Sequence, residues 1–351
     1  MYKNDEEKVP DYVLIQLGEE TLKLPKTVEN KRYSGVIKEC QIETITPIFI
    51  GSDVKKQEKI KTRNGQIKAH NKEKFLYDAK NKKYMIPSSS LKGMIRNICD
   101  MVTNSVIVES KINLKDEIYK DKPHDFIKKE FHPTNENNNL SISEEMFGAT
   151  MNSVVNNKAG EKFKNSKGKI YFTDAKLDEK KAKLEKDFLL NPLHSPRKVK
   201  FEYKNNNKYI TGRKYYRHNL NIAKNNLRSK NKNAQNTTIE LMEKGNKFIF
   251  DVYFENLSYF EMGLLMYLLK LEDKMYHKIG RGKPLGMGSC KIELGKLYLD
   301  REREEKYKTF SYKKKLVNKE AMLIKLSEKF KLKSNSRENM KELEKVLKGK
   351  I

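Results

Sequence analysis

The sequence contains little cysteine and no clustered metal ligands. Its three cysteines, Cys40, Cys99 and Cys290, stand far apart, and no Cys-x-x-Cys pair occurs. This argues against a disulfide framework and against a cysteine zinc site. Each cysteine lies in an apolar periodic segment, so we expect all three in the core. The six histidines are scattered and form no His-Glu-x-x-His motif.

Long hydrophobic runs are also missing. No apolar stretch approaches the roughly 18 residues that a membrane-spanning helix needs, and no signal peptide opens the chain. We therefore expect a soluble, cytoplasmic protein with no membrane association.

Negative charge is in short supply. The 351 residues include 74 Lys and Arg against 47 Asp and Glu, a formal net charge of +27. Such an excess favours a polyanionic partner, with nucleic acid first and an anionic membrane surface second. The chain has neither a cationic helix of strong amphipathic character nor a helix-turn-helix pattern, which argues against membrane-surface and DNA binding.

The hydrophobic pattern predicts a small set of core elements separated by polar insertions. Strands are predicted at 34–50, 168–177, 247–254 and 290–299, and helices at 87–102 and 258–271, where Ser258 and Glu261 form a capping-box pattern. Residues 51–83 form a predicted charged loop, with a hairpin at Asn64-Gly65. We place insertions at 104–166 and 178–246, an N-terminal arm at 1–33, the main domain at 34–300 and a helical extension at 301–351.

The order of these elements predicts the fold class. Without the insertions, the order is strand, helix, strand, strand, helix, strand, which is the βαββαβ plan of an α+β, ferredoxin-like fold. Its antiparallel sheet carries helices on one face, and RRM-type modules use the open face for RNA.

The segment IPSSSLKGMIRN, residues 86–97, predicts a helix that binds an anion. Ser88 or Ser89 can cap the helix, and Pro87 stops it from extending backwards. The hydroxyls of Ser88, Ser89 and Ser90, together with Lys92 and Arg96, would form a cradle for phosphate, and Gly93 would let a nucleic-acid backbone approach. The alternative is an ordinary capped helix with solvated cations.

Two further segments combine cations with glycine or aromatic residues. In GRGKPLGMGS, Gly280, Gly282, Gly286 and Gly288 surround Arg281 and Lys283 and can offer backbone N–H groups to phosphates, unless the segment is a plain loop. In TGRKYYRHN, Arg213, Lys214 and Arg217 alternate with Tyr215, Tyr216 and His218, which suits phosphates and bases of single-stranded RNA. His218 alone is more typical of a hydrogen-bonding residue than of a general base.

These segments resemble the RAMP superfamily of CRISPR-associated proteins, most closely the backbone subunits of type III effectors, including type III-D. IPSSSLKGMIRN is similar to the family pattern IPGSSLKGxxR, with Ser88 in place of glycine. GRGKPLGMGS is similar to the family's glycine-rich loop, and SEEMFGATMN with GKIYFTDAKL resembles the stretch around its central strand. The resemblance covers roughly residues 34–300.

The resemblance implies binding of a CRISPR guide RNA and of complementary target RNA, together with other effector subunits. In catalytic members, an aspartate on the loop after the first strand cleaves target RNA with a divalent metal, Mg²⁺ or Mn²⁺. The 51–83 segment offers Asp53, Glu58, Glu73 and Asp78. Asp53 is the first candidate for catalysis and metal binding, and Asp78 is the second.

Two alternative functions stay open within this family. The chain could be a non-catalytic structural subunit that caps the filament, because several loop carboxylates compete for the decisive role. It could also be a metal-independent endoribonuclease that processes guide RNA, although the SSSLKGMIR segment is more typical of backbone subunits.

Overall fold

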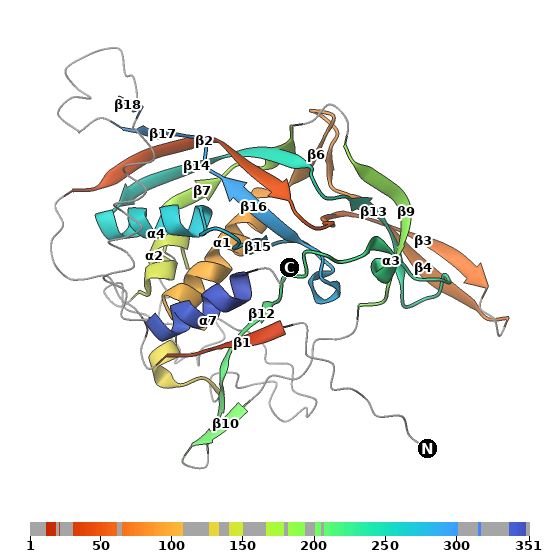
Figure 1. Cartoon of the computed structure of the whole chain (residues 1–351), viewed down its shortest axis with the longest axis horizontal. Helices are drawn as coiled ribbons and strands as arrows, with labels where there is room; N and C mark the ends of the chain where they lie inside the picture. The colour runs from red at the N-terminus through yellow and green to blue at the C-terminus, as the bar shows by residue number, and fades with distance from the viewer. Residues whose placement is uncertain are drawn as a thin grey trace, which may run out of the picture.

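The computed structural model describes residues 12–18, 21, 31–61, 65–107, 126–132, 140–149, 166–178, 182–193, 201–204, 207–300, 315–316 and 337–348. The protein is an α+β structure with many strands and few helices (Figure 1).

A large sheet forms the centre of the molecule. Its strands pair in the order β15-β16-β2-β14-β8-β6-β5, and β7, β17 and β18 join it at the sides. The pairs of β2 with β14 and β16, and of β14 with β7 and β8, are antiparallel. The bounds of these strands are β2 (Tyr33–Thr44), β5 (Tyr77–Asp78), β6 (Lys83–Ile86), β7 (Ile170–Phe172), β8 (Ala175–Leu177), β14 (Lys247–Leu257), β15 (His277–Lys278), β16 (Ser289–Glu293), β17 (Lys296–Leu299) and β18 (Lys315–Leu316).

The helices gather on one side of this sheet (Figure 1). They are α1 (Ser88–Val102), α2 (Ile142–Phe147), α4 (Tyr259–Leu269) and α7 (Arg337–Leu347), with a short α3 (Lys224–Leu227) elsewhere and 3-10 turns at Lys129–Phe131 and Lys283–Leu285. The capping box of Ser258 and Glu261 at α4 is confirmed.

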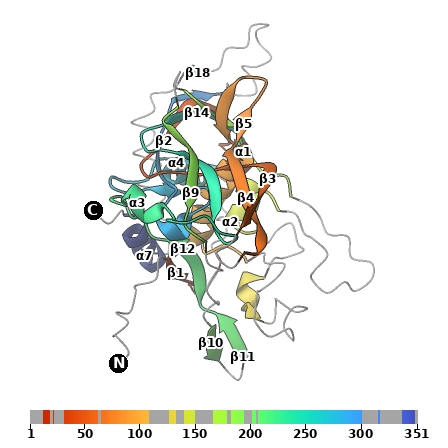
Figure 2. The ribbon, with the colours of Figure 1, turned by 90° about the vertical axis from the view of Figure 1, so that its right-hand side faces the viewer.

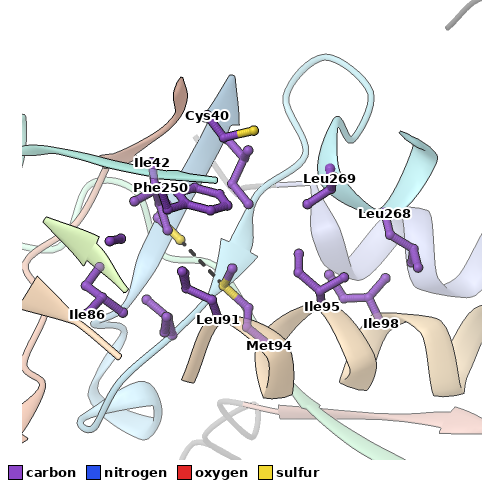
Figure 3. Packing of buried hydrophobic residues seen from close by; sticks show 14 of the residues in the cluster. Cys40, Ile42, Ile86, Leu91, Met94, Ile95, Ile98, Phe250, Leu268 and Leu269 are labelled. Carbon is purple, nitrogen blue, oxygen red and sulfur yellow. Dashed lines mark hydrogen bonds between the residues drawn. The ribbon is translucent and has the colours of Figure 1, made fainter. Parts of the chain in front are cut away.

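The core lies between the sheet and α1. Every second residue of β14 is buried, as the alternation of phenylalanines predicts. Phe250, with Cys40 and Ile42 of β2, faces Leu91 and Ile95 of α1 (Figure 3). All three cysteines are buried, as expected, and none of them forms a disulfide. The Cys290 thiol contacts the Met94 sulfur at 3.9 Å, which joins β16 to α1.

The predicted charged loop at 51–83 is wrong, although the hairpin predicted within it is confirmed. The segment contains β3 (Gly51–Lys61) and β4 (Ile67–Phe75), which pair as an antiparallel hairpin. They belong to a second sheet of order β3-β4-β13-β9, completed by β13 (Thr237–Met242) and β9 (Leu184–Leu190) (Figure 2). Apolar and polar residues do not alternate along β4, because two of its polar residues, His70 and Glu73, are buried.

Other boundaries also differ from the prediction. The strand at 34–50 ends at Thr44, the strand at 168–177 is split into β7 and β8, and the strand at 290–299 is split into β16 and β17. Most of 301–351 lies outside the described residues, and within the described part α7 is helical and buries Leu343 and Leu347.

Two small strand pairs complete the fold. β1 (Tyr12–Gln16), from the N-terminal arm, pairs antiparallel with β12 (Gly212–Tyr216), from the second insertion. The hairpin of β10 (Phe201–Lys204) and β11 (Asn207–Ile210) extends away from the body (Figure 2). Within the described residues, no helix is long and apolar enough to cross a membrane.

Acidification should destabilise this fold through a buried histidine. The Nε2 atom of His277 lies 2.8 Å from the Leu268 carbonyl, and burial lowers the His277 pKa from 6.5 to about 4. Between pH 6.5 and about pH 4, the unfolded chain binds a proton at this histidine that the folded chain does not bind. The free energy of unfolding therefore falls as the pH falls. The loss should reach about 3 kcal/mol at pH 4.

Urea unfolding at pH 7, 5.5 and 4.5 measures this effect. His277→Gln keeps a donor for the Leu268 carbonyl and should flatten the pH dependence relative to the wild type. Identical pH profiles for the two proteins would contradict the prediction.

Candidate functional site

Four segments that are distant in the sequence meet at one cleft of about 650 Å³. They are the connection from β2 to β3, the first half of α1, the edge of β12 and the glycine-rich loop after β15. The lining residues are Phe49, Ile50, Gly51, Pro87, Ser90, Gly93, Met94, Asn97, Lys214, Tyr215, Tyr216, Lys278, Ile279, Gly280, Arg281 and Lys283. The lining thus includes four cations and no carboxylate among the described residues.

Helix α1 contributes a stripe of small and polar residues to the cleft. Ser90, Gly93 and Asn97 recur at the spacing of one helix face, opposite the apolar stripe that packs on the sheet. A side chain added at Gly93 would meet nothing within 4 Å, so the glycine leaves the wall open. At Gly93, in the interior of the helix, no side chain projects into the cleft.

The predicted serine cap of α1 is wrong. The helix begins at Ser88, its N-cap is Pro87, and no side chain of the N-cap residue bonds to the first turn. Instead the carboxylate of Asp174 accepts a hydrogen bond from the Ser88 N–H at 2.7 Å. An acid from the β7–β8 connection therefore occupies part of the helix end that we expected to bind phosphate.

The two cations of α1 lie beside the cleft stripe and do not line it. Arg96 donates to the Gly148 carbonyl at 2.9 Å and approaches Asp100 at 4.0 Å. Burial, and next the Arg96 charge, lower the pKa of Lys92. Arg96 thus fastens α1 to the end of α2, and neither Lys92 nor Arg96 is among the residues that line the cleft.

The glycine-rich loop is folded back onto residues 47–49. The N–H groups of Arg281 and Gly288 donate to the carbonyls of Phe49 and Pro47 at 3.0 and 2.9 Å. Gly280 has a φ of 80°, and a Cβ there would stand 2.6 Å from the Phe49 oxygen. This position therefore requires glycine both for its backbone angle and for the close approach.

Strand β12 supplies a cation held between aromatic rings. The Lys214 ammonium lies 4.2 Å from the Tyr12 ring centre and 4.9 Å from that of Tyr216. The neighbouring Arg213 donates to the carbonyls of Ser105 and Val106 and thereby anchors the strand. Lys214 and Tyr216 line the cleft as the sequence suggested, whereas Arg213 has a structural contact.

The expectation that His218 contacts RNA is contradicted by its burial. Its side chain is 2% exposed, and Nδ1 lies 2.9 Å from the Ser289 hydroxyl. Burial, and next the charge of Lys278, hold its pKa well below 6.5, so the ring is neutral. Lys278 donates to the same hydroxyl at 3.2 Å and to the Gly286 carbonyl at 3.1 Å, at the inner end of the cleft.

The candidate acids lie in different places. Asp53 stands in β3, not in a loop, two residues after the cleft residue Gly51, and its side chain is outside the described part. Asp78 closes the β5–β6 turn, where it accepts from Lys80 and Asn81 backbone N–H groups at 3.0 and 3.1 Å. The side-chain hydrogen bond from Asn81 is the main cause of its lowered pKa. β5 is at the opposite end of the sheet order from β15, and Asp78 is not among the residues that line the cleft.

The described residues contain no group of three His, Cys, Asp or Glu side chains that could hold a metal. Glu58 is paired with Lys232, and Glu73 with Arg281. Mg²⁺, however, is commonly bound through one or two carboxylates plus substrate phosphates. Of the two candidate acids, only Asp53 belongs to a strand whose first residue, Gly51, lines the cleft.

The open face of the large sheet differs from the cleft. Its cations alternate with acids, as in the ion pairs of Lys296 with Glu39 at 3.2 Å and of Lys167 with Glu255 at 3.8 Å. A face of mixed charge attracts a polyanion less than a cleft lined by one sign. The RNA surface that the RRM comparison suggested is therefore less favoured than the cleft.

Comparison with protein families identifies the chain. The family model of the RAMP superfamily matches residues 41–291, well over half of the 351 residues. The chain belongs to the RAMP superfamily. The match runs from β2 to β16, and so includes all four segments that form the cleft of this RAMP protein.

Other comparisons are distant. No curated protein matches the sequence significantly. A solved structure described as a "Type IV-B CRISPR Complex" is similar over 75% of this chain and 90% of that chain, with 12% identity and a TM-score of 0.32.

Several site residues were missed by reasoning from the sequence. Asp174 was not recognised as the partner of the α1 N-terminus, nor Asn97 and Lys278 as cleft residues. For Asn97 a signal existed, because it follows Ser90 and Gly93 on the polar side of the helix. For Asp174 none existed, because the contact spans 86 residues of sequence.

Proposed function

We propose that this RAMP protein is a guide-RNA-binding subunit of a CRISPR effector complex, built on a ferredoxin-like core. The observation that carries the proposal is the cleft, where α1, the glycine-rich loop and β12 meet. Its described lining contains four cations and no carboxylate. Cations bind phosphates, and the partly exposed ring of Tyr216 suits an unstacked base. The sequence resemblance favours the backbone subunits of type III complexes, with target RNA and other effector subunits as further partners.

The ferredoxin-like assignment rests on the order of the strands. Along the chain β2, α1, β7 with β8, β14, α4 and β16 follow one another, and in the sheet β16, β2, β14 and β8 are neighbours. Each strand is antiparallel to its neighbour. In a split βαβ plan the strand after the second helix lies beside the first strand, as here.

A non-catalytic subunit is the second candidate. It is favoured by the absence of carboxylates and histidines from the described lining of the cleft. A metal-independent guide-processing enzyme has less support, because His218, the histidine of the aromatic-basic cluster, is buried.

Gly93 offers a test in which stability and binding change in opposite directions. Replacement by Ala should stabilise the helix by about 0.5–1 kcal/mol, because glycine is unfavourable in a helix interior and nothing obstructs the new methyl group. Gly93→Leu should fold equally well yet fill the wall of the cleft. We expect it to weaken binding of single-stranded guide RNA at least 10-fold.

Thermal unfolding and RNA titration at several salt concentrations measure both quantities. Lys92→Leu places the same side chain on the adjacent helix face and serves as the control, with a smaller loss of affinity. Failure of the wild type to bind RNA would overturn the proposed function, whereas unchanged affinity of Gly93→Leu would remove the cleft as the binding site.

A further inference from the structure

A buried carboxylate stands directly behind the cation-lined cleft. Glu73, on β4, is 3% exposed, and its side chain accepts a hydrogen bond from Arg281 of the glycine-rich loop. A Cβ added to Gly51 would lie 3.1 Å from its Oε2 atom, which places the carboxylate against the cleft wall. An acid at this position repels a polyanion, so its presence in an otherwise cationic site calls for a reason.

Arg281 is held from three directions. Its backbone N–H donates to the Phe49 carbonyl at 3.0 Å, its guanidinium lies 5.8 Å from the Phe49 ring centre, and Nη1 donates to Glu73. The side chain is nevertheless 45% exposed and lines the cleft. A guanidinium has five N–H donors, so an Arg that bonds a carboxylate with one N–H can still bond a phosphate with others.

We propose that Glu73 is a positioning residue for RNA, which orients Arg281 so that its remaining N–H groups face a phosphate in the cleft. This inference rests on the proposed RNA binding. Lysine could not take the place of Arg281, because an ammonium is a point charge and cannot bond the two anions in a fixed plane. The same contact joins the β3–β4 hairpin to the glycine-rich loop. Arg281 therefore takes part both in binding RNA and in holding the hairpin in place.

Electrostatics alone and positioning predict opposite results for Glu73→Gln. The substitution keeps the size of the side chain, removes one negative charge beside the cleft and replaces the charge-assisted hydrogen bond to Arg281 by a weaker neutral one. If charge alone mattered, RNA would bind more tightly. If Glu73 orients Arg281, RNA should bind about 10-fold more weakly, and the slope of log affinity against log salt should become shallower by about 0.7, the value for one lost contact to a single strand.

Four further variants sharpen the test. Glu58→Gln removes the same charge from the same hairpin, where Glu58 pairs with Lys232 outside the cleft, and should leave affinity unchanged or slightly higher. Arg281→Ala should match Glu73→Gln in its salt slope, and the double variant should be no worse than Arg281→Ala, because both act through one contact. Arg281→Lys leaves Glu73 with a cationic partner, so it should fold even if Glu73→Gln does not, and it should still lose about 10-fold in affinity.

The outcomes separate this inference from the proposed function. Wild-type protein that binds no RNA overturns both. Wild-type protein that binds RNA, with Glu73→Gln or Arg281→Lys binding as well or better at an unchanged salt slope, overturns the positioning role alone. Additive losses in the double variant would also contradict it.

Discussion

Replacing Lys214 and Lys283 together by methionine is expected to weaken binding of single-stranded guide RNA about 100-fold or more. Both side chains line the cleft, and charge-assisted hydrogen bonds contribute about 1.5–3 kcal/mol each. The salt slope should become shallower by about 1.4, since each contact to a single strand contributes about 0.7. The weakening should be similar for RNAs of different sequence, because phosphate contacts carry no sequence information.

The fold should tolerate this double change. Burial lowers the pKa of Lys283 because it disfavours the charged form, and a methionine of similar length relieves that cost. Lys214 loses its contacts with Tyr12 and Tyr216, which are worth about 1 kcal/mol at a partly exposed site.

A matched control lies on the open face of the sheet. Lys38, whose ammonium lies 6.0 Å from the Tyr298 ring centre, and the exposed Lys291 can be changed to methionine together. Both double variants lower the net charge from +27 by two, to +25. Equal losses of affinity in the two would show that total charge, and not the cleft, governs RNA binding.

Complete loss of cleavage is the expected result for Asp53→Asn, provided that the assembled complex cuts complementary RNA. Gly51 lines the cleft and Asp53 follows two residues later, which is about 7 Å along an extended strand. A carboxylate there would share a divalent cation with the RNA phosphates, so EDTA should also stop the reaction. Attack of a ribose 2′-OH on the adjacent phosphorus breaks the P–O5′ bond, which leaves a 2′,3′-cyclic phosphate and a 5′-OH end.

Binding and cutting should separate in this variant. Asp53→Asn removes a negative charge near the cleft, so target binding should be unchanged or slightly stronger. Asp78→Asn is the matched control: its carboxylate closes a turn at the far end of the sheet, so cleavage should persist. A complex that binds matched RNA and never cuts it in Mg²⁺ or Mn²⁺ would establish the non-catalytic candidate.

Local patterns in the sequence specified the core and most segments of the cleft. The alternating phenylalanines of β14 and the apolar stripe of α1 specified which faces are buried, because burial follows a period of 2 in strands and 3.6 in helices. The glycines of GRGKPLGMGS marked a tight loop, since Gly280 and Gly288 have φ angles of 80° and 92°. Lys214, Lys283 and Gly93 were named from these local patterns, and all three line the cleft.

Which polar groups face the cleft, and which bind other parts of the protein, depends on contacts between distant segments. Arg96, Arg213 and His218 were plausible RNA ligands by residue type, yet each bonds to groups 52, 107 or 71 residues away. Glu73 was one loop acid among four, and it became the partner of Arg281 because β4 enters a sheet with β13. Periodicity reports burial along one element, whereas the pairing of charges depends on which elements meet, and long-range contacts of this kind leave no local pattern.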